Sequence, residues 1–320
     1  MRKWITLLMT LLVGCGSYAN ANVGQVSFEA GYRRDTIDWR TRFPSDDPFL
    51  KSSTRFKDLD IFQIGVHGRS TIGNNFYVRG SAYWGWILDG DFHHNGSLHL
   101  DPTCHDRDFH LGLSDDFRST IDDQYVFGVG AAVGYPLYFC DCTLVVAPVI
   151  GYAVDEQNVR VNNRTLNFGR FDSYGDDNVG GCCRHTFISR WYGPFVGFDF
   201  DWRPYNSCFN VWAELEYHWG SFRGKTSDID DNRDIDGFDR HNRHSSKATA
   251  WVFGAGFDYD LCNNWTIGLS VKFQDWSANR HHRACLDDSI SYFGSFCDHR
   301  YRENNKWRSY AINLTFGRDF

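Results

Sequence analysis

The sequence predicts an all-β protein, a transmembrane antiparallel up-and-down β-barrel, and three observations carry this prediction. Apolar and polar residues alternate with a period of two along most of the chain, as they do in strands with one apolar and one wet face. Aromatic residues make up 17% of the chain although its mean hydropathy is only -0.47. Beyond the N-terminus there is no run of about 18 apolar residues, so strands rather than helices would have to cross a bilayer.

The N-terminus predicts a signal peptide over residues 1–21, which leaves the barrel as residues 22–320. Arg2 and Lys3 precede an apolar core at residues 5–13, and Ala19-Asn20-Ala21 offers a cleavage site between small residues. An alternative is lipoprotein processing at Leu12-Val13-Gly14-Cys15, with Cys15 acylated. Both alternatives predict export from the cytoplasm.

Ten segments with this alternation follow one another along the mature chain. They span residues 25–33, 62–67, 76–89, 125–137, 144–154, 196–203, 211–219, 251–260, 265–274 and 310–320. The last segment is the most regular, with an apolar face formed by Tyr310, Ile312, Leu314, Phe316 and Phe320. Its other face holds Ser309, Asn313, Thr315 and Asp319. An even number of strands is typical of outer-membrane barrels.

The connections between these segments alternate in length. Short turns are expected at residues 72–75, 139–142, 203–208 and 261–264. Long polar loops are expected at about residues 41–54, 93–123, 162–189, 222–246 and 280–305. Four short turns and five long loops match a barrel with periplasmic turns and outer loops. A twelve-stranded barrel is an alternative, with two further strands drawn from residues 93–123.

A soluble β-sandwich would also show alternation, but two features favour the membrane barrel. The charged face recurs on nearly every strand, and tryptophans gather toward strand ends, where aromatic girdles meet lipid headgroups. These tryptophans are Trp84, Trp86, Trp202, Trp219, Trp251, Trp265 and Trp276.

The last strand resembles the assembly signal of bacterial outer-membrane barrels, which ends on an aromatic residue, here Phe320. The chain length, the ten cysteines and the stretch at residues 190–197 are similar to the porin-like outer-membrane proteins of chlamydia-like bacteria, the Protochlamydia outer membrane protein family. The resemblance implies an outer-membrane location, contact with outer-membrane lipid and with the barrel-assembly machinery, and disulfide links to other envelope proteins.

Side chains alternate between the two faces of a strand, and this parity predicts which charged side chains line the lumen. These are Glu29, Arg79, Asp199, Asp201, Arg203, Glu214, Glu216, His218, Asp258, Asp260 and Lys272. Ten strands enclose a narrow space, because broad aqueous channels use about 16–18 strands. The lumen is therefore expected to be either a narrow, mildly cation-favouring pore for small solutes or a plug of Arg–carboxylate pairs. A porin-like or structural surface protein without cofactor is the leading interpretation, and an adhesin that acts through its loops is an alternative.

A second alternative is an enzyme, because two carboxylates close the third predicted strand. Asp89 and Asp91 are expected to point toward the mouth of the lumen, where paired carboxylates could position a water molecule. Asp239 and His241 follow on a later loop. This pattern resembles the omptins, ten-stranded outer-membrane proteases, and implies that Asp89 and Asp91 hold the water while Asp239 and His241 act as base. Asp239 lies farther from its strand than the corresponding omptin motif does.

The cysteines fall on both kinds of expected connection. Cys140, Cys142, Cys208 and Cys262 fall on expected periplasmic turns, and Cys104, Cys182, Cys183, Cys285 and Cys297 on expected outer loops. They are candidates for disulfides, since the chain is exported.

Without residues 1–21 the chain keeps 31 basic and 40 acidic residues, which argues against nucleic acid as a partner. The histidines do not have the spacing of a metal site.

Overall fold

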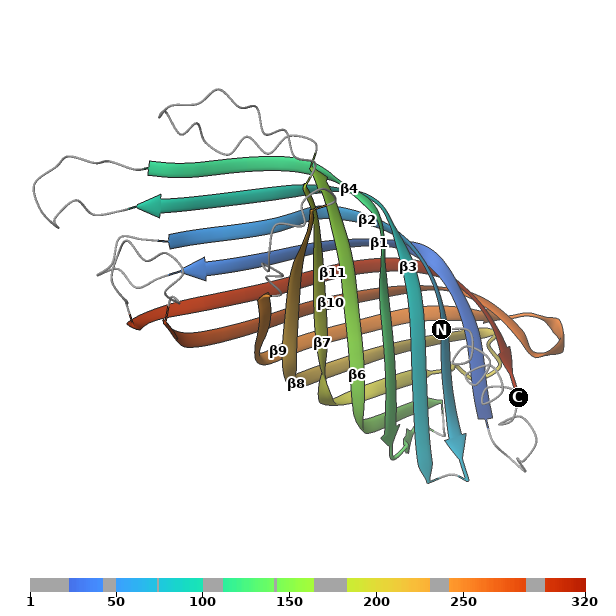
Figure 1. Cartoon of the computed structure of the whole chain (residues 1–320). Helices are drawn as coiled ribbons and strands as arrows, with labels where there is room; N and C mark the ends of the chain where they lie inside the picture. The colour runs from blue at the N-terminus through green and yellow to red at the C-terminus, as the bar shows by residue number, and fades with distance from the viewer. Residues whose placement is uncertain are drawn as a thin grey trace, which may run out of the picture.

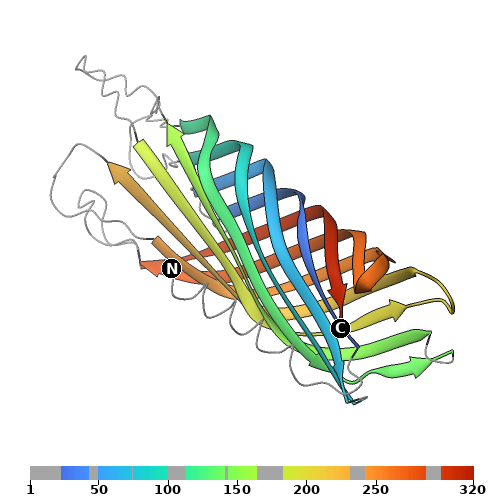
Figure 2. The same ribbon diagram turned by 90° about the vertical axis from the view of Figure 1, so that its right-hand side faces the viewer.

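The computed structural model describes residues 23–42, 50–73, 75–99, 112–140, 143–163, 183–230, 242–285 and 297–320. They form one closed antiparallel barrel, in which the strands tilt and bend around a common axis (Figures 1 and 2). The strands are β1 (Val23–Arg42), β2 (Leu50–Ile72), β3 (Phe76–His99), β4 (Gly112–Gly134), β5 (Leu137–Phe139), β6 (Leu144–Asn163), β7 (Cys183–Trp202), β8 (Phe209–Asp230), β9 (Asn242–Asp260), β10 (Trp265–Cys285) and β11 (Cys297–Asp319).

Each strand pairs with its neighbours in sequence, and pairing of β1 with β11 closes the ring. The short strand β5 follows β4 after Tyr135-Pro136 and also pairs with β6, so the ring counts ten strands. The prediction of ten antiparallel strands is confirmed. In the part of the chain that the structure describes, no helix is both long and apolar enough to span a membrane.

The strands are much longer than the apolar alternation predicted, with 19 residues in β9 and 24 in β3. Residues 93–99 extend β3, and residues 112–123 extend β4, so the twelve-stranded alternative is wrong. Much of the other predicted loops is likewise strand. The alternation fades there because, above the lipid, the outer face no longer has to be apolar, while the backbone pairing continues.

The outer face of the barrel carries an apolar belt. On β8 it comprises Phe209, Val211, Ala213, Leu215, Tyr217 and Trp219, and each neighbouring strand has a similar row. Trp86, Trp202, Trp219, Trp251 and Trp265 are exposed on this face, as expected of aromatic girdles. Trp276 was predicted among them, but it is fully buried inside the barrel because even positions of β10 face the lumen.

The outer half of β1, β2 and β3 contains a set of β-bulges. The pairing of β2 with β3 shifts between Lys57 and Asp60 and again between Asp60 and Ile61, and Asp58 adopts a positive φ of 51°. The pairing of β1 with β2 shifts between Asp35 and Ile37. A bulge puts one extra residue into a strand and therefore reverses the face to which the following side chains point.

Candidate functional site

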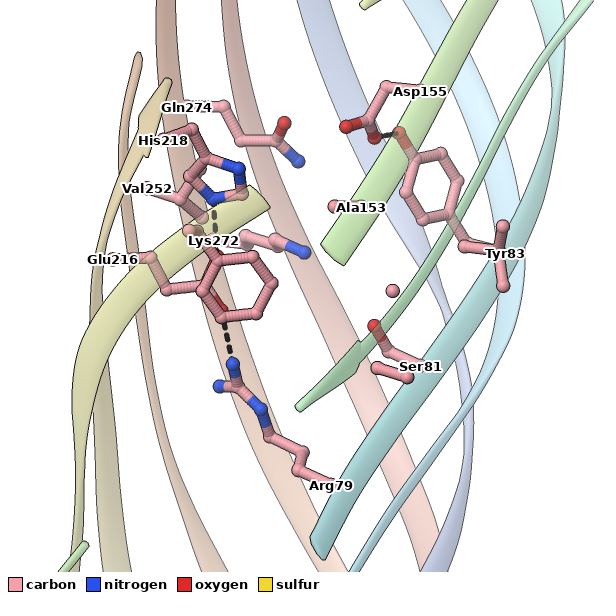
Figure 3. A pocket seen from close by; sticks show the side chains of 14 residues that line it. Arg79, Ser81, Tyr83, Ala153, Asp155, Glu216, His218, Val252, Lys272 and Gln274 are labelled. Carbon is pink, nitrogen blue, oxygen red and sulfur yellow. Dashed lines mark hydrogen bonds and ion pairs between the residues drawn. The ribbon is translucent and has the colours of Figure 1, made fainter. Parts of the chain in front are cut away.

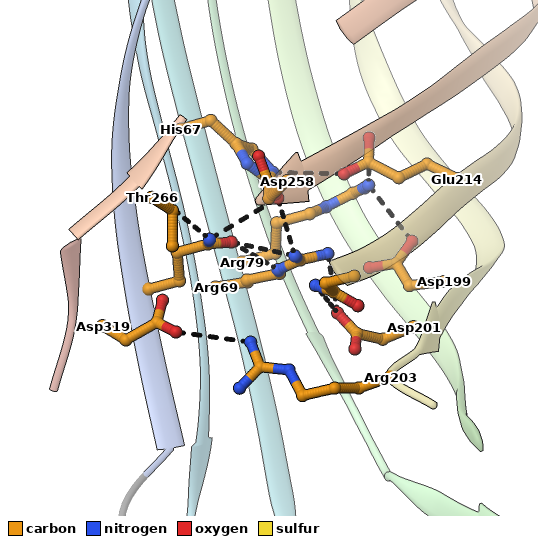
Figure 4. Close-up of polar contacts among 12 residues, drawn as sticks. His67, Arg69, Arg79, Asp199, Asp201, Arg203, Glu214, Asp258, Thr266 and Asp319 are labelled. Atoms are coloured by element: carbon orange, nitrogen blue, oxygen red, sulfur yellow. Dashed lines mark hydrogen bonds and ion pairs between the residues drawn. The ribbon is translucent and has the colours of Figure 1, made fainter. Parts of the chain in front are cut away.

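The lumen is the candidate functional site, and its periplasmic half is filled by ion pairs (Figure 4). Arg79 of β3 reaches across the barrel, where one guanidinium nitrogen lies 2.6 Å from Glu214 and 3.1 Å from Asp199. Its other terminal nitrogen contacts Glu216. All four side chains have little exposure to solvent, so this single arginine bridges a buried cluster of three carboxylates.

A second arginine extends this network toward the periplasmic end. Arg69 lies 2.9 Å from Asp201 and 3.5 Å from Asp258, and it donates two hydrogen bonds to the Gln25 side chain. His67 lies 3.1 Å from Glu214 of the Arg79 cluster. Arg203 pairs with Asp319 at 3.3 Å near the end of the chain. The periplasmic half of the lumen is thus cross-linked by charge between strands that are not adjacent.

The middle of the barrel contains two neighbouring cavities with empty volumes of about 400 and 610 Å³. Ser81, Tyr83, Lys272 and Gln274 line both of them (Figure 3). Lys272 Nζ lies 6.0 Å from the centre of the Tyr83 ring, and the Tyr83 hydroxyl donates to Asp155 at 2.5 Å. The polar linings suit water, because each cavity offers several donors and acceptors.

The outer half of the lumen is filled by aliphatic and aromatic side chains, which we call the aromatic plug after the rings at its centre. Its buried members are Ile37, Phe56, Leu59, Ile61, Ile87, Phe92, Val126, Val159, Val161, Trp191, Phe222, Ala248, Ala250, Trp276, Ala278 and Trp307, with Trp39, Tyr83 and Phe187 packed against them. The Trp276 ring lies 5.8 Å from Trp191 and 6.2 Å from Trp307 between centroids. These three tryptophans are fully buried, so the plug is closely packed at its centre.

An ion pair lies directly beneath the plug. Arg33 and Asp35 make two hydrogen bonds of 2.7 Å and are both buried. Trp307 Nε1 donates to Asp35 at 3.0 Å, and the Arg33 guanidinium lies 5.3 Å from the centre of the Trp307 ring. These contacts couple the charged half of the lumen to the aromatic half.

The structure places the predicted lumen residues on the inner face. Glu29, Arg79, Asp199, Asp201, Glu214, Glu216, His218, Asp258 and Lys272 take part in the network or line the cavities, Asp260 is half-buried, and Arg203 lies at the periplasmic end. Sequence reasoning missed Arg33, Asp35, His67, Arg69 and Asp155. The same alternation, applied to every residue, would have found Arg33 and His67 within the segments where it was recognised. Asp35, Arg69 and Asp155 lie one or two residues beyond those segments.

Asp89 and Asp91 do not face the lumen. The bulge in β3 leaves Leu88 and Asp89 both exposed, after which Gly90 and Phe92 take the inner positions and Asp91 is exposed. The expectation that odd positions point inward is therefore wrong for this end of the strand. Asp239 and His241, the other half of the proposed catalytic set, lie outside the described residues.

The cysteines are spread over both ends of the barrel. Cys140 and Cys208 are exposed free thiols on the periplasmic turns. Cys183, Cys285 and Cys297 were predicted on loops but belong to strand ends, and the backbone of Cys285 lies opposite that of Cys297. Cys104, Cys142 and Cys182 fall outside the described residues. Among the side chains that are described, no three potential ligands are grouped around a metal site.

Comparison with known proteins is consistent with this architecture. Residues 27–320 match the Protochlamydia outer membrane protein family. The chain belongs to this family. No curated protein matches significantly.

The fold of this family member is similar to that of a solved outer-membrane barrel, the outer membrane protease OmpT from Escherichia coli. The TM-score is 0.60 at 11% identity, with 95% of this chain and 98% of OmpT covered. The outer membrane protein OprG from Pseudomonas aeruginosa also matches, with a TM-score of 0.35 at 12% identity over 93% of this chain and 96% of OprG. At such identities the similarity to OmpT shows the fold and no activity. The protein is an outer-membrane β-barrel.

Proposed function

We propose that this protein is a structural surface protein of the outer membrane, a barrel whose lumen is closed to diffusing solutes. The observation that carries the proposal is the aromatic plug, which occupies the lumen between the central cavities and the outer end. A porin for hydrophilic solutes needs a continuous polar path, whereas apolar constrictions exclude water and ions. On this proposal, the water-filled cavities are internal spaces and not parts of a channel.

The charge network supports the same proposal. Arg69, Arg79 and Arg203 each pair with carboxylates from other strands, so these charges are held in contacts across the lumen. An ion-selective pore instead presents rings of unneutralised charge to the permeating ion. Of the two sequence-based interpretations of the lumen, the structure favours the plug over the pore.

Export and assembly complete the proposal. We infer that residues 1–21 act as a signal peptide and that Phe320 contributes to recognition by the barrel-assembly machinery. Phe320 is exposed on the outer face, and its backbone N–H donates to the Gly24 carbonyl at 2.9 Å, so the end of the chain is paired where the ring closes.

A proteolytic function receives no support from Asp89 and Asp91, because their side chains lie on the outer face.

Electrical recording tests the proposed closure. We expect the folded full-length barrel to insert into planar lipid bilayers without producing discrete conductance steps, while a general porin reconstituted in parallel conducts. Insertion is verified by the heat-modifiable mobility of the barrel recovered from the same lipid. Regular conductance steps from the inserted wild-type barrel would contradict the proposal and restore the porin-like interpretation.

A further inference from the structure

Four basic side chains form a row on the outer face, directly above the apolar belt. This basic row comprises Arg190 of β7, Arg223 and Lys225 of β8, and Lys247 of β9. Their sequence neighbours Trp191, Phe222 and Ala248 are buried in the lumen, so the row faces outward. Below the row the belt ends on Tyr192, Trp219 and Trp251, whose rings are of the type found at lipid headgroup level.

The basic row is not neutralised by the side chains that the structure describes. Arg190 lies directly opposite Arg223 in the pairing of β7 with β8, and like charges in this position repel each other. Arg190 is paired with Glu156 of β6, which is the only carboxylate on this face of β6–β9 among the side chains that the structure describes. Arg223 contacts the Tyr192 ring, 5.3 Å from its centre. Four positive charges therefore share one negative charge.

On the opposite side of the barrel, arginines at the same level form ion pairs with carboxylates. Arg34 lies 3.1 Å from Asp60 and 3.7 Å from Asp58, and Arg308 lies 3.5 Å from Asp275. These ion pairs also lie just above the apolar belt, since Tyr32 and Tyr310 occupy the next outward positions below. Lys306 and Arg302 of β11 are exposed on this side as well, so positive charge is not confined to β7–β9; at β7 and β8, however, two arginines lie directly opposite each other.

We propose that the basic row binds the phosphate groups of an anionic lipid in the outer leaflet. A lipid phosphate at headgroup level would lie between Arg190 and Arg223 and relieve their repulsion, and guanidinium groups bind phosphate through two parallel hydrogen bonds. The acyl chains of the same lipid would pack on the belt beneath. A free phosphate ion would contact only the arginines, whereas a lipid would contact both the arginines and the apolar belt. The lipid is therefore the occupant that fits the whole surface.

Native mass spectrometry of the folded full-length barrel, titrated with bisphosphorylated lipid A, tests the proposal. The variant is Arg223→Gln with Lys225→Gln, because neither residue forms an ion pair with a side chain in the described part of the chain. The matched control is Arg308→Gln with Lys306→Gln, two basic residues with the same spacing on β11. Each Lys or Arg near an anionic lipid surface contributes about fivefold to affinity, so we expect about 25-fold weaker binding by the variant and near wild-type binding by the control.

Three results would overturn the proposal: equal lipid affinity of variant and wild type, equal affinity of wild type for dephosphorylated lipid A, or an equal loss in the control. Competition by inorganic phosphate distinguishes the two sources of phosphate. Displacement of the lipid by equimolar phosphate would show a free-anion site instead. If the double variant does not fold, as judged by heat-modifiable mobility, Arg223→Gln alone should weaken binding about fivefold, and an unchanged affinity would again reject the proposal.

Discussion

Arg79 shows how one residue can organise the lumen. It lies on β3, yet its guanidinium contacts Asp199 of β7 and Glu214 and Glu216 of β8. These carboxylates come from strands far from β3 in the ring, so the ion pairs span the interior instead of following the strand ladder. Buried ion pairs of this kind contribute to stability chiefly because neither partner can be removed without leaving the other uncompensated.

Replacement of Arg79 by Met should therefore destabilise the barrel strongly. Loss of one partner of a buried ion pair costs about 3–5 kcal/mol of unfolding free energy. The measurement is urea unfolding of the folded barrel in lipid vesicles. The comparison variant is Arg203→Met: Arg203 is 40% exposed and pairs only with Asp319, so its loss should cost less than about 1 kcal/mol. Equal effects of the two substitutions would mean that the Arg79 cluster is not the cross-link described above.

Parity of a strand predicts the direction of a side chain only where the ladder is regular. For Glu214, Glu216 and Asp258 the period of two gave the correct inner face. For Asp89 and Asp91 it failed, because an extra residue in β3 reverses all later positions. Asp89-Gly90 follows the extra residue, but the position of the bulge depends on pairing with β2, which has its own irregularity at Asp58.

At the scale of the strand, β7 and β8 meet at a close contact between two glycines. A Cβ atom on Gly193 would lie 2.4 Å from the Cα atom of Gly220, and one on Gly220 would lie 2.2 Å from the Tyr192 carbonyl oxygen. Pro194, which has no N–H to donate to the ladder, follows at once. The two glycines allow the backbones to approach at the height where the aromatic plug meets the central cavities.

Substitution of Gly193 by Ala should impair the barrel at this contact. The added methyl group has only backbone atoms to displace, and forced insertion of a methyl group into a packed site costs about 1–3 kcal/mol. Gly130→Ala on β4 is the control, because its Cβ atom would have no neighbour closer than 3.6 Å. The folded fraction after refolding, read from heat-modifiable mobility, should fall for Gly193→Ala only. A similar folded fraction for both variants would contradict this account of the contact.

At the scale of the whole molecule, the barrel combines two kinds of interior. Its periplasmic half is held by charge and its outer half by aromatic packing, with the polar cavities between them. The outer face is divided as well, with Arg–Asp ion pairs over β1, β2, β10 and β11 and the basic row over β7–β9. This arrangement suits a rigid, closed barrel that is oriented in the membrane by its outer surface.

Removal of the tryptophans at the centre of the plug should open the lumen. Trp191→Ala with Trp276→Ala deletes two fully buried rings, and we expect discrete conductance steps in planar bilayers where the wild type is silent. Trp219→Ala with Trp251→Ala removes the same side chains from the outer face and should leave the barrel silent. Each buried substitution costs about 3–5 kcal/mol, so folding must be verified first. A folded plug variant without conductance would show that the lumen is closed elsewhere.

The sequence by itself determined the class of fold, the number of strands and, where the ladder is regular, the face on which each charged residue lies. All three follow from the local period of two, because the side chains of a single strand alternate between the two faces of the sheet. Even the family resemblance was visible in the terminal strand and in the stretch around Tyr192 and Gly193.

Only the tertiary structure decided what fills the lumen. Trp191, Trp276 and Trp307 lie on three different strands and meet because the ring closes. Near a strand end that is surrounded by polar residues, the sequence does not distinguish a tryptophan that points into the lumen from one that points outward. For this reason Trp276 was predicted on the wrong face. The repulsion between Arg190 and Arg223 is likewise invisible until the register of β7 against β8 is fixed, because register is a property of the strand pair and not of either strand alone.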